Sequence, residues 1–113
     1  MFKLIRDNIP EMMHEEGQPL DFAVAQNDEF FKNLLRGKLI EEVQEYLNSG
    51  DSIEELADIQ TVLNSLISDR KAQFDQVYAE KLEQHGGFEK RYIGFFPDPR
   101  REPTKANVQV EDN

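Results

Sequence analysis

Apolar residues recur every three or four positions between Asp28 and Asn48, which is the spacing of an amphipathic helix. The apolar positions are Phe31, Leu34, Leu35, Leu39, Val43, Tyr46 and Leu47. Ser49, Gly50 and Asp51 interrupt the pattern and predict a tight turn at the end of this helix.

A second helix is predicted to begin directly after Ser52, because Ser52-x-x-Glu55 fits a capping box. Its apolar positions keep the helical period through Ile53, Leu56, Ile59, Val62, Leu63, Leu66 and Ile67. Two amphipathic helices joined by so short a turn pack antiparallel, so the sequence predicts a two-helix hairpin.

Two further helices are predicted on either side of the hairpin. A short one opens at Pro10 and closes at Gly17, since proline favours the first helical turn and glycine the residue after the last. A longer one runs from Asp69 to Gln84 and ends before Gly86. Its apolar side is formed by Phe74, Val77, Tyr78 and Leu82.

Strand signals are confined to residues 90–96, and residues 97–113 show no apolar repeat. We therefore expect one all-α domain over residues 1–96 and an extended or mobile tail over residues 97–113. The expected architecture is a small helical bundle around the antiparallel hairpin, with a third helix and a flexible C-terminal tail. Because a domain of this size buries only about two thirds of its surface alone, we also expect self-association into a dimer or tetramer.

The net charge of the chain limits the classes of molecule that it can bind. Asp and Glu number 23 against 13 Lys and Arg, which gives a net charge of -10 that would repel a nucleic acid polymer. No window approaches the roughly 18 to 20 apolar residues of a membrane span, and the N-terminus lacks a signal peptide layout. The chain has no cysteine, so a cytoplasmic protein is the simplest expectation. From the charge and the lack of an apolar span, we expect it to bind neither a nucleic acid polymer nor a membrane.

Two acidic motifs are candidates for a catalytic or metal-binding site. They are Glu41-Glu42-x-x-Glu45 on the first long helix and Glu55-x-x-Asp58 on the second. Residues three or four apart share one side of a helix, so the hairpin can bring both motifs together. Glu55 falls in the apolar column of its helix, while Glu42 and Asp58 border apolar stripes.

Two interpretations of Glu55 follow: it completes the capping box begun by Ser52, or it joins a cluster of carboxylates between the helices. Carboxylates gathered at one interface raise one another's pKa or require a counter-ion. Oxygen ligands without cysteine or histidine favour a hard ion, Mg²⁺ or Mn²⁺.

Basic residues supply the second part of the pattern. Lys81 lies on the apolar side of its helix, where it either extends its ammonium group to solvent or binds an anion. Lys3, Arg6 and Arg91 come from the segments that flank the bundle. An acidic metal site with basic residues around it suits a phosphate ester bridged to a metal ion.

Four segments of the chain, in order over residues 3–91, carry a family resemblance. They are Lys3-Leu-Ile-Arg-Asp-Asn-Ile-Pro10-Glu, Lys38-Leu-Ile-Glu-Glu-Val-Gln-Glu45, Glu54-Glu-Leu-Ala-Asp58-Ile and Lys81-x-x-x-His-Gly-Gly-Phe88-x-x-Arg91. Together they resemble the MazG-like and phosphoribosyl-ATP pyrophosphohydrolase-like group of all-α nucleotide pyrophosphohydrolases.

The resemblance implies a Mg²⁺-dependent enzyme, Mn²⁺ being the alternative ion, that hydrolyses a nucleoside triphosphate (NTP or dNTP) to the monophosphate and pyrophosphate. The resemblance also suggests a house-cleaning role, in which the enzyme hydrolyses non-standard nucleotides. It further implies a homodimer or homotetramer. The implied metal ligands are Glu42, Glu45, Glu55 and Asp58. Glu41 would be the catalytic carboxylate that orients or deprotonates the attacking water. The implied phosphate contacts are Lys81, Arg91, Lys3 and Arg6.

A second class of function fits the same residues. An acidic helical module without enzymatic activity would dock a partner helix on its hairpin, and its carboxylates would serve only to keep it soluble. Turnover of a triphosphate separates the two classes.

Overall fold

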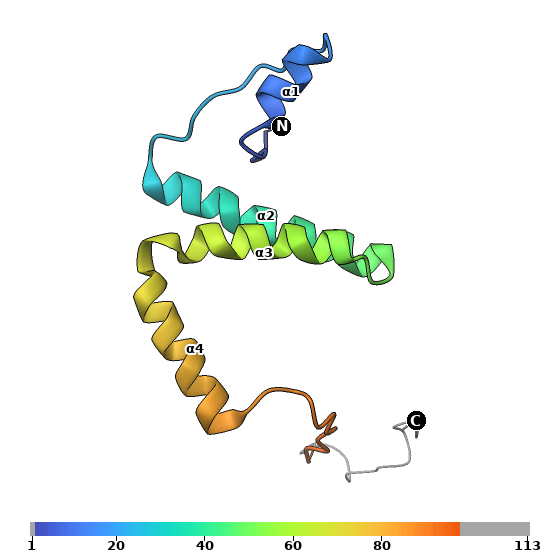
Figure 1. Ribbon diagram of the computed structural model, residues 1–113, viewed down its shortest axis with the longest axis vertical. Helices are drawn as coiled ribbons and strands as arrows, with labels where there is room; N and C mark the ends of the chain where they lie inside the picture. Colours follow the sequence, from blue (N-terminus) through green and yellow to red (C-terminus); the bar gives the residue numbers. More distant parts are fainter. Residues whose placement is uncertain (1, 98–113) are drawn as a thin grey trace. The chain divides into compact units, whose positions relative to one another are not determined.

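The computed structural model describes residues 2–97, and every regular element in that range is helical (Figure 1). The elements are α1 (Ile9–Glu15), α2 (Asp28–Ser49), α3 (Ile53–Ile67), the 3₁₀ turn η1 (Ser68–Arg70) and α4 (Lys71–His85). The predicted all-α class is confirmed. The described residues form two compact units, residues 2–75 and residues 76–97.

Helices α2 and α3 form the predicted antiparallel hairpin and run side by side along their length (Figure 1). The turn between them depends on Gly50, whose φ of 90° lies in the left-handed region that glycine adopts without strain. Asp51 follows with φ at 147°. The hydroxyl of Tyr46 donates a hydrogen bond of 2.6 Å to the Asp51 carboxylate, which links the last turn of α2 to the hairpin turn and raises the pKa of Tyr46.

The start of α2 is fixed by a side-chain cap. The Asn27 side chain accepts a hydrogen bond of 2.9 Å from the backbone N–H of Phe30, which satisfies one of the donors left free in a first helical turn. This cap marks the first turn of α2, while the apolar pattern of the helix determines which side chains face α3.

The flanking helices largely follow their sequence signals. Pro10 lies in the first turn of α1, and Gly17 follows its end with φ at 76°. The helix predicted over Asp69 to Gln84 starts two residues later, because η1 occupies residues 68–70. Helix α4 then runs from Lys71 to His85 and ends just before Gly86. The strand signal at residues 90–96 was wrong, because these residues form no strand. Apart from residue 97, the predicted tail lies outside the described residues.

The buried side chains within residues 2–97 all belong to the hairpin. Leu35 of α2 and Val62 of α3 are the buried apolar side chains in this range, and Glu42 is buried beside them. Leu47 and Ile53, at the turn end of the hairpin, are 69% and 75% exposed. In this range no helix is both long enough and apolar enough to pass through a bilayer.

Truncation of the hairpin core tests this distribution of burial. Val62→Ala removes two methyl groups from a side chain that is 7% exposed, and should lower the free energy of unfolding by about 1 to 3 kcal/mol. Val24→Ala makes the same deletion at a side chain that is 70% exposed and should change it by less than about 0.5 kcal/mol. Urea denaturation measures both values, and equal losses in the two variants would contradict the assigned core.

Candidate functional site

Two groups of carboxylates meet on the hairpin. Glu41, Glu42 and Glu45 of α2 form one group, and Glu42, Glu55 and Asp58 form the other. Within each group, one oxygen atom from every residue lies within 4.8 Å of the others. Glu42 belongs to both groups, so the five acids named in the sequence analysis form one continuous cluster across α2 and α3, called the acidic cluster below.

The centre of the acidic cluster is desolvated. Glu42 is 6% exposed, and burial raises its pKa, with the nearby Glu45 acting in the same direction. The Oε2 atoms of Glu42 and Glu55 are both buried without a hydrogen-bond partner. A buried carboxylate oxygen that lacks a donor is costly, so each of these atoms has capacity for a cation or a proton.

The structure decides between the two interpretations of Glu55. Ser52 is the N-cap of α3, but its side chain makes no capping hydrogen bond. The backbone N–H of Ser52, which a capping box would give to Glu55, donates instead to the Ser49 hydroxyl at 3.1 Å. The predicted capping box is therefore not formed, and the Glu55 side chain belongs to the acidic cluster with Glu42 and Asp58.

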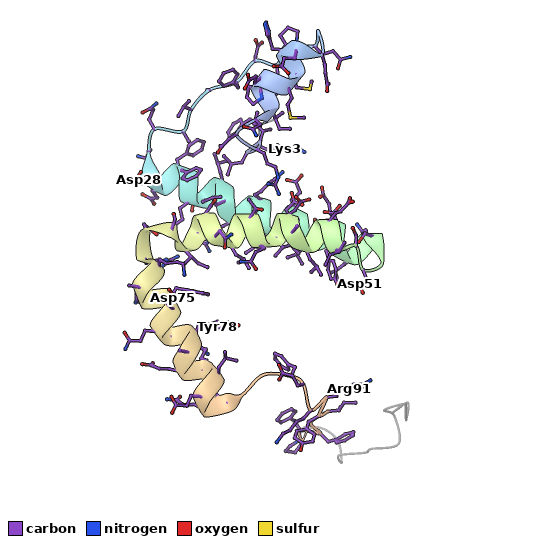
Figure 2. The ribbon with its side chains drawn as sticks, viewed as in Figure 1. Lys3, Asp28, Asp51, Asp75, Tyr78 and Arg91 are labelled. Carbon is purple, nitrogen blue, oxygen red and sulfur yellow. The ribbon has the colours of Figure 1, made fainter. Side chains whose placement is uncertain are left out.

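Two of the predicted basic residues reach the acidic cluster from the segment before α1. Arg6 Nη2 lies 2.6 Å from Asp58 Oδ1, and it also donates to Thr61 Oγ1 at 3.2 Å. Lys3 Nζ lies 3.2 Å from Glu41 Oε1, and this hydrogen bond lowers the pKa of Glu41. Figure 2 shows Lys3 on the segment that lies beside the hairpin.

A third cation, Lys38, was not among the predicted site residues. Its Nζ lies 3.4 Å from Glu41 Oε2 and 3.4 Å from Glu42 Oε1, and its side chain is 19% exposed. The sequence did carry a signal for it, since residues three and four apart are neighbours on a helix surface. Five carboxylates against three cations leave two negative charges uncompensated in the cluster.

The other two predicted phosphate contacts belong to the second unit. Lys81 lies on α4 and Arg91 on the segment that follows it, and both side chains are exposed. Arg91 has a φ of 60°, in the left-handed region. Their assignment as phosphate contacts stays a prediction.

Two acids of the cluster, Glu42 and Asp58, line a groove of about 600 Å³ in the first unit. One wall comes from the segment before α1 and from α1 itself, including Ile5, Ile9 and Met12. The other wall comes from α2 and α3. The charged residues in its lining include Arg6, Lys38, Glu42 and Asp58. The groove thus joins an apolar surface to a site that carries both signs of charge.

Comparisons of the chain with models of protein families, with curated proteins and with solved structures find no match. The resemblance of the four sequence segments therefore stays a prediction.

Removal of the buried charge at Glu42 tests the electrostatics of the acidic cluster. In buffer with chelator, Glu42→Gln should raise the free energy of unfolding by about 1 kcal/mol, because a neutral amide costs less to bury than a carboxylate. Lys38 keeps Glu41 as its partner in this variant. Thermal denaturation followed by circular dichroism measures the change.

Glu54→Gln is the matched control, since Glu54 is an exposed acid on α3 that lies next to Glu55 and outside both carboxylate groups. It should change the free energy of unfolding by less than about 0.5 kcal/mol. A loss of stability in Glu42→Gln as large as that in Val62→Ala would show that the Glu42 carboxylate is fully compensated without a metal ion.

Proposed function

We propose that this chain is a Mg²⁺-dependent nucleoside triphosphate pyrophosphohydrolase. The observation that carries the proposal is the pair of buried, unpartnered carboxylate oxygens, Glu42 Oε2 from α2 and Glu55 Oε2 from α3, beside a groove lined with cations. A cluster of carboxylates that served only solubility would keep its oxygens hydrated. These two oxygens are withdrawn from water and still lack donors.

The residues present fit a hard divalent cation. The donors are all carboxylate oxygens, which suit Mg²⁺ or Mn²⁺. Glu42, Glu55 and Asp58 would hold it, with Glu45 at the flank. When bound, the ion would neutralise part of the phosphate charge and activate a water molecule.

Glu41 is suited to orient the attacking water. The hydrogen bond from Lys3 lowers the pKa of the Glu41 carboxylate, and Lys38 on the same helix acts in the same direction, so Glu41 stays ionised at neutral pH. A carboxylate with a lowered pKa is a weak base but a good hydrogen-bond acceptor. We therefore assign it the positioning of a water for attack on the α-phosphorus.

The groove accounts for the remaining parts of a nucleotide. Arg6 and Lys38 line it next to the acids, and they can stabilise the charge that develops on the departing pyrophosphate as the bond to the α-phosphorus breaks. Apolar side chains such as Met12 and Phe31 line the same groove and offer a surface for the nucleoside. Lys81 and Arg91 are further candidate phosphate contacts.

We also propose that the enzyme is a homodimer or homotetramer. The apolar residues Ile40, Leu47 and Ile53 of the hairpin are between 61% and 75% exposed in a single chain. Surface of this kind on consecutive helices is typical of a protein interface. A second copy of the hairpin offers the same apolar surface in return.

Turnover measurements test the function. With Mg²⁺ and a panel of standard and modified NTPs and dNTPs, the wild-type chain should release pyrophosphate and a nucleoside monophosphate. Glu42→Gln and Asp58→Asn should each lower kcat/KM at least about 100-fold, since residues that merely orient a metal ligand already contribute about 10- to 100-fold.

Glu54→Gln provides the matched charge control and should keep the wild-type rate. Equal rates in Glu42→Gln, Asp58→Asn and the wild type would exclude the acidic cluster as the active site. If the folded wild-type chain cleaves no triphosphate in the panel, the acidic helical module without enzymatic activity becomes the better assignment.

Light scattering tests the assembly. The full chain should give a mass of two or four times the 13.2 kDa of one copy. Leu47→Glu, which places a charge on the exposed apolar surface, should shift the distribution toward the single chain. A wild-type sample that contains only a 13.2 kDa species at micromolar concentration would contradict the proposed oligomer.

A further inference from the structure

Two ion pairs fasten residues 2–8 to the acidic cluster. Arg6 binds Asp58 at 2.6 Å, and Lys3 binds Glu41 at 3.2 Å. The backbone carbonyl of Arg6 also accepts a hydrogen bond of 3.1 Å from Ile9, the first residue of α1. This hydrogen bond links Arg6 to the start of α1.

The Arg6 guanidinium occupies a carboxylate that a bound cation would also need. Asp58 shares one group with Glu42 and Glu55, whose Oε2 atoms are buried and unpartnered, and Glu42 is 6% exposed. Arg6 contacts the Oδ1 atom of Asp58. A divalent cation at these three carboxylates would bind the same carboxylate group and would repel the guanidinium. Two positive groups thus compete for one carboxylate.

We propose that residues 2–8 are an electrostatic latch, which Lys3 and Arg6 hold closed on the acidic cluster and which binding of a divalent cation releases. The proposal rests on the metal centre of the proposed function. Leu4, Ile5, Asp7 and Asn8 belong to the lining of the groove, so release of the latch moves one of its walls. Lys3 and Arg6 are then free to bind the phosphates of an incoming nucleotide.

Cation affinity gives the first test. Mg²⁺ is titrated calorimetrically into the full-length wild type, Arg6→Gln and Arg70→Gln without nucleotide. Arg6→Gln should bind Mg²⁺ about two- to fivefold more tightly, the range that corresponds to loss of one exposed ion pair. Arg70→Gln removes the same charge from an arginine that contacts Asp69 and the Leu66 carbonyl, outside the acidic cluster, and should leave the affinity unchanged.

Displacement of the latch gives the second test. Because the chain has no cysteine, Glu11→Cys on α1 and Glu54→Cys on α3 place two spin labels at unique, exposed positions. Pulsed electron resonance on labelled chains diluted with unlabelled protein measures the distance within one chain. Saturating Mg²⁺ should lengthen or broaden that distance distribution. Addition of Arg6→Gln to the labelled protein should produce the same change without Mg²⁺.

The outcomes separate the latch from the metal centre. If Mg²⁺ binds the wild type and Arg6→Gln with equal affinity, and the distance distribution stays the same, the latch is wrong and the metal centre stands. If Mg²⁺ binds neither protein, both the proposed metal centre and the proposed latch are wrong.

Discussion

The interface between α2 and α3 has to accommodate several carboxylates that repel one another in a partly dehydrated space. Glu42 is largely buried, so solvent screens its charge only weakly and its pKa is raised. Lys38 from the same helix and Arg6 from the N-terminal segment offset part of the repulsion. The ionic contacts of the N-terminal segment offset this repulsion, and the proposed divalent cation would offset it further.

Most of the fold could be predicted from residue spacing, because the helical period and the turn at Gly50 are local properties of the chain. The orientation argument also placed Glu42, Glu55 and Asp58 toward one another, and the structure brings them together. Two kinds of feature were less accessible. The strand signal at residues 90–96 reflected β-propensity alone, and no partner strand exists among the described residues. The role of Lys38 depends on where its flexible side chain turns, which spacing permits but does not fix.

The choice between two roles for Glu55 shows where sequence reasoning reaches its limit. The Ser52-x-x-Glu55 pattern satisfies the rule for a capping box, yet Ser49 takes the backbone N–H of Ser52. Competition between two acceptors for one donor is decided by the geometry of the turn, and a sequence pattern does not contain that geometry. Release of Glu55 from capping leaves its carboxylate available to the acidic cluster.

The central claim is that Glu42, Glu55 and Asp58 together bind one divalent cation. Anomalous diffraction from a crystal of the full chain soaked in Mn²⁺, recorded above the manganese absorption edge, tests it most directly. The account predicts an anomalous peak within coordination distance of these three carboxylates, at about 2.0 to 2.6 Å. A map without a peak there, in a crystal where the three side chains are ordered and accessible to solvent channels, would contradict it.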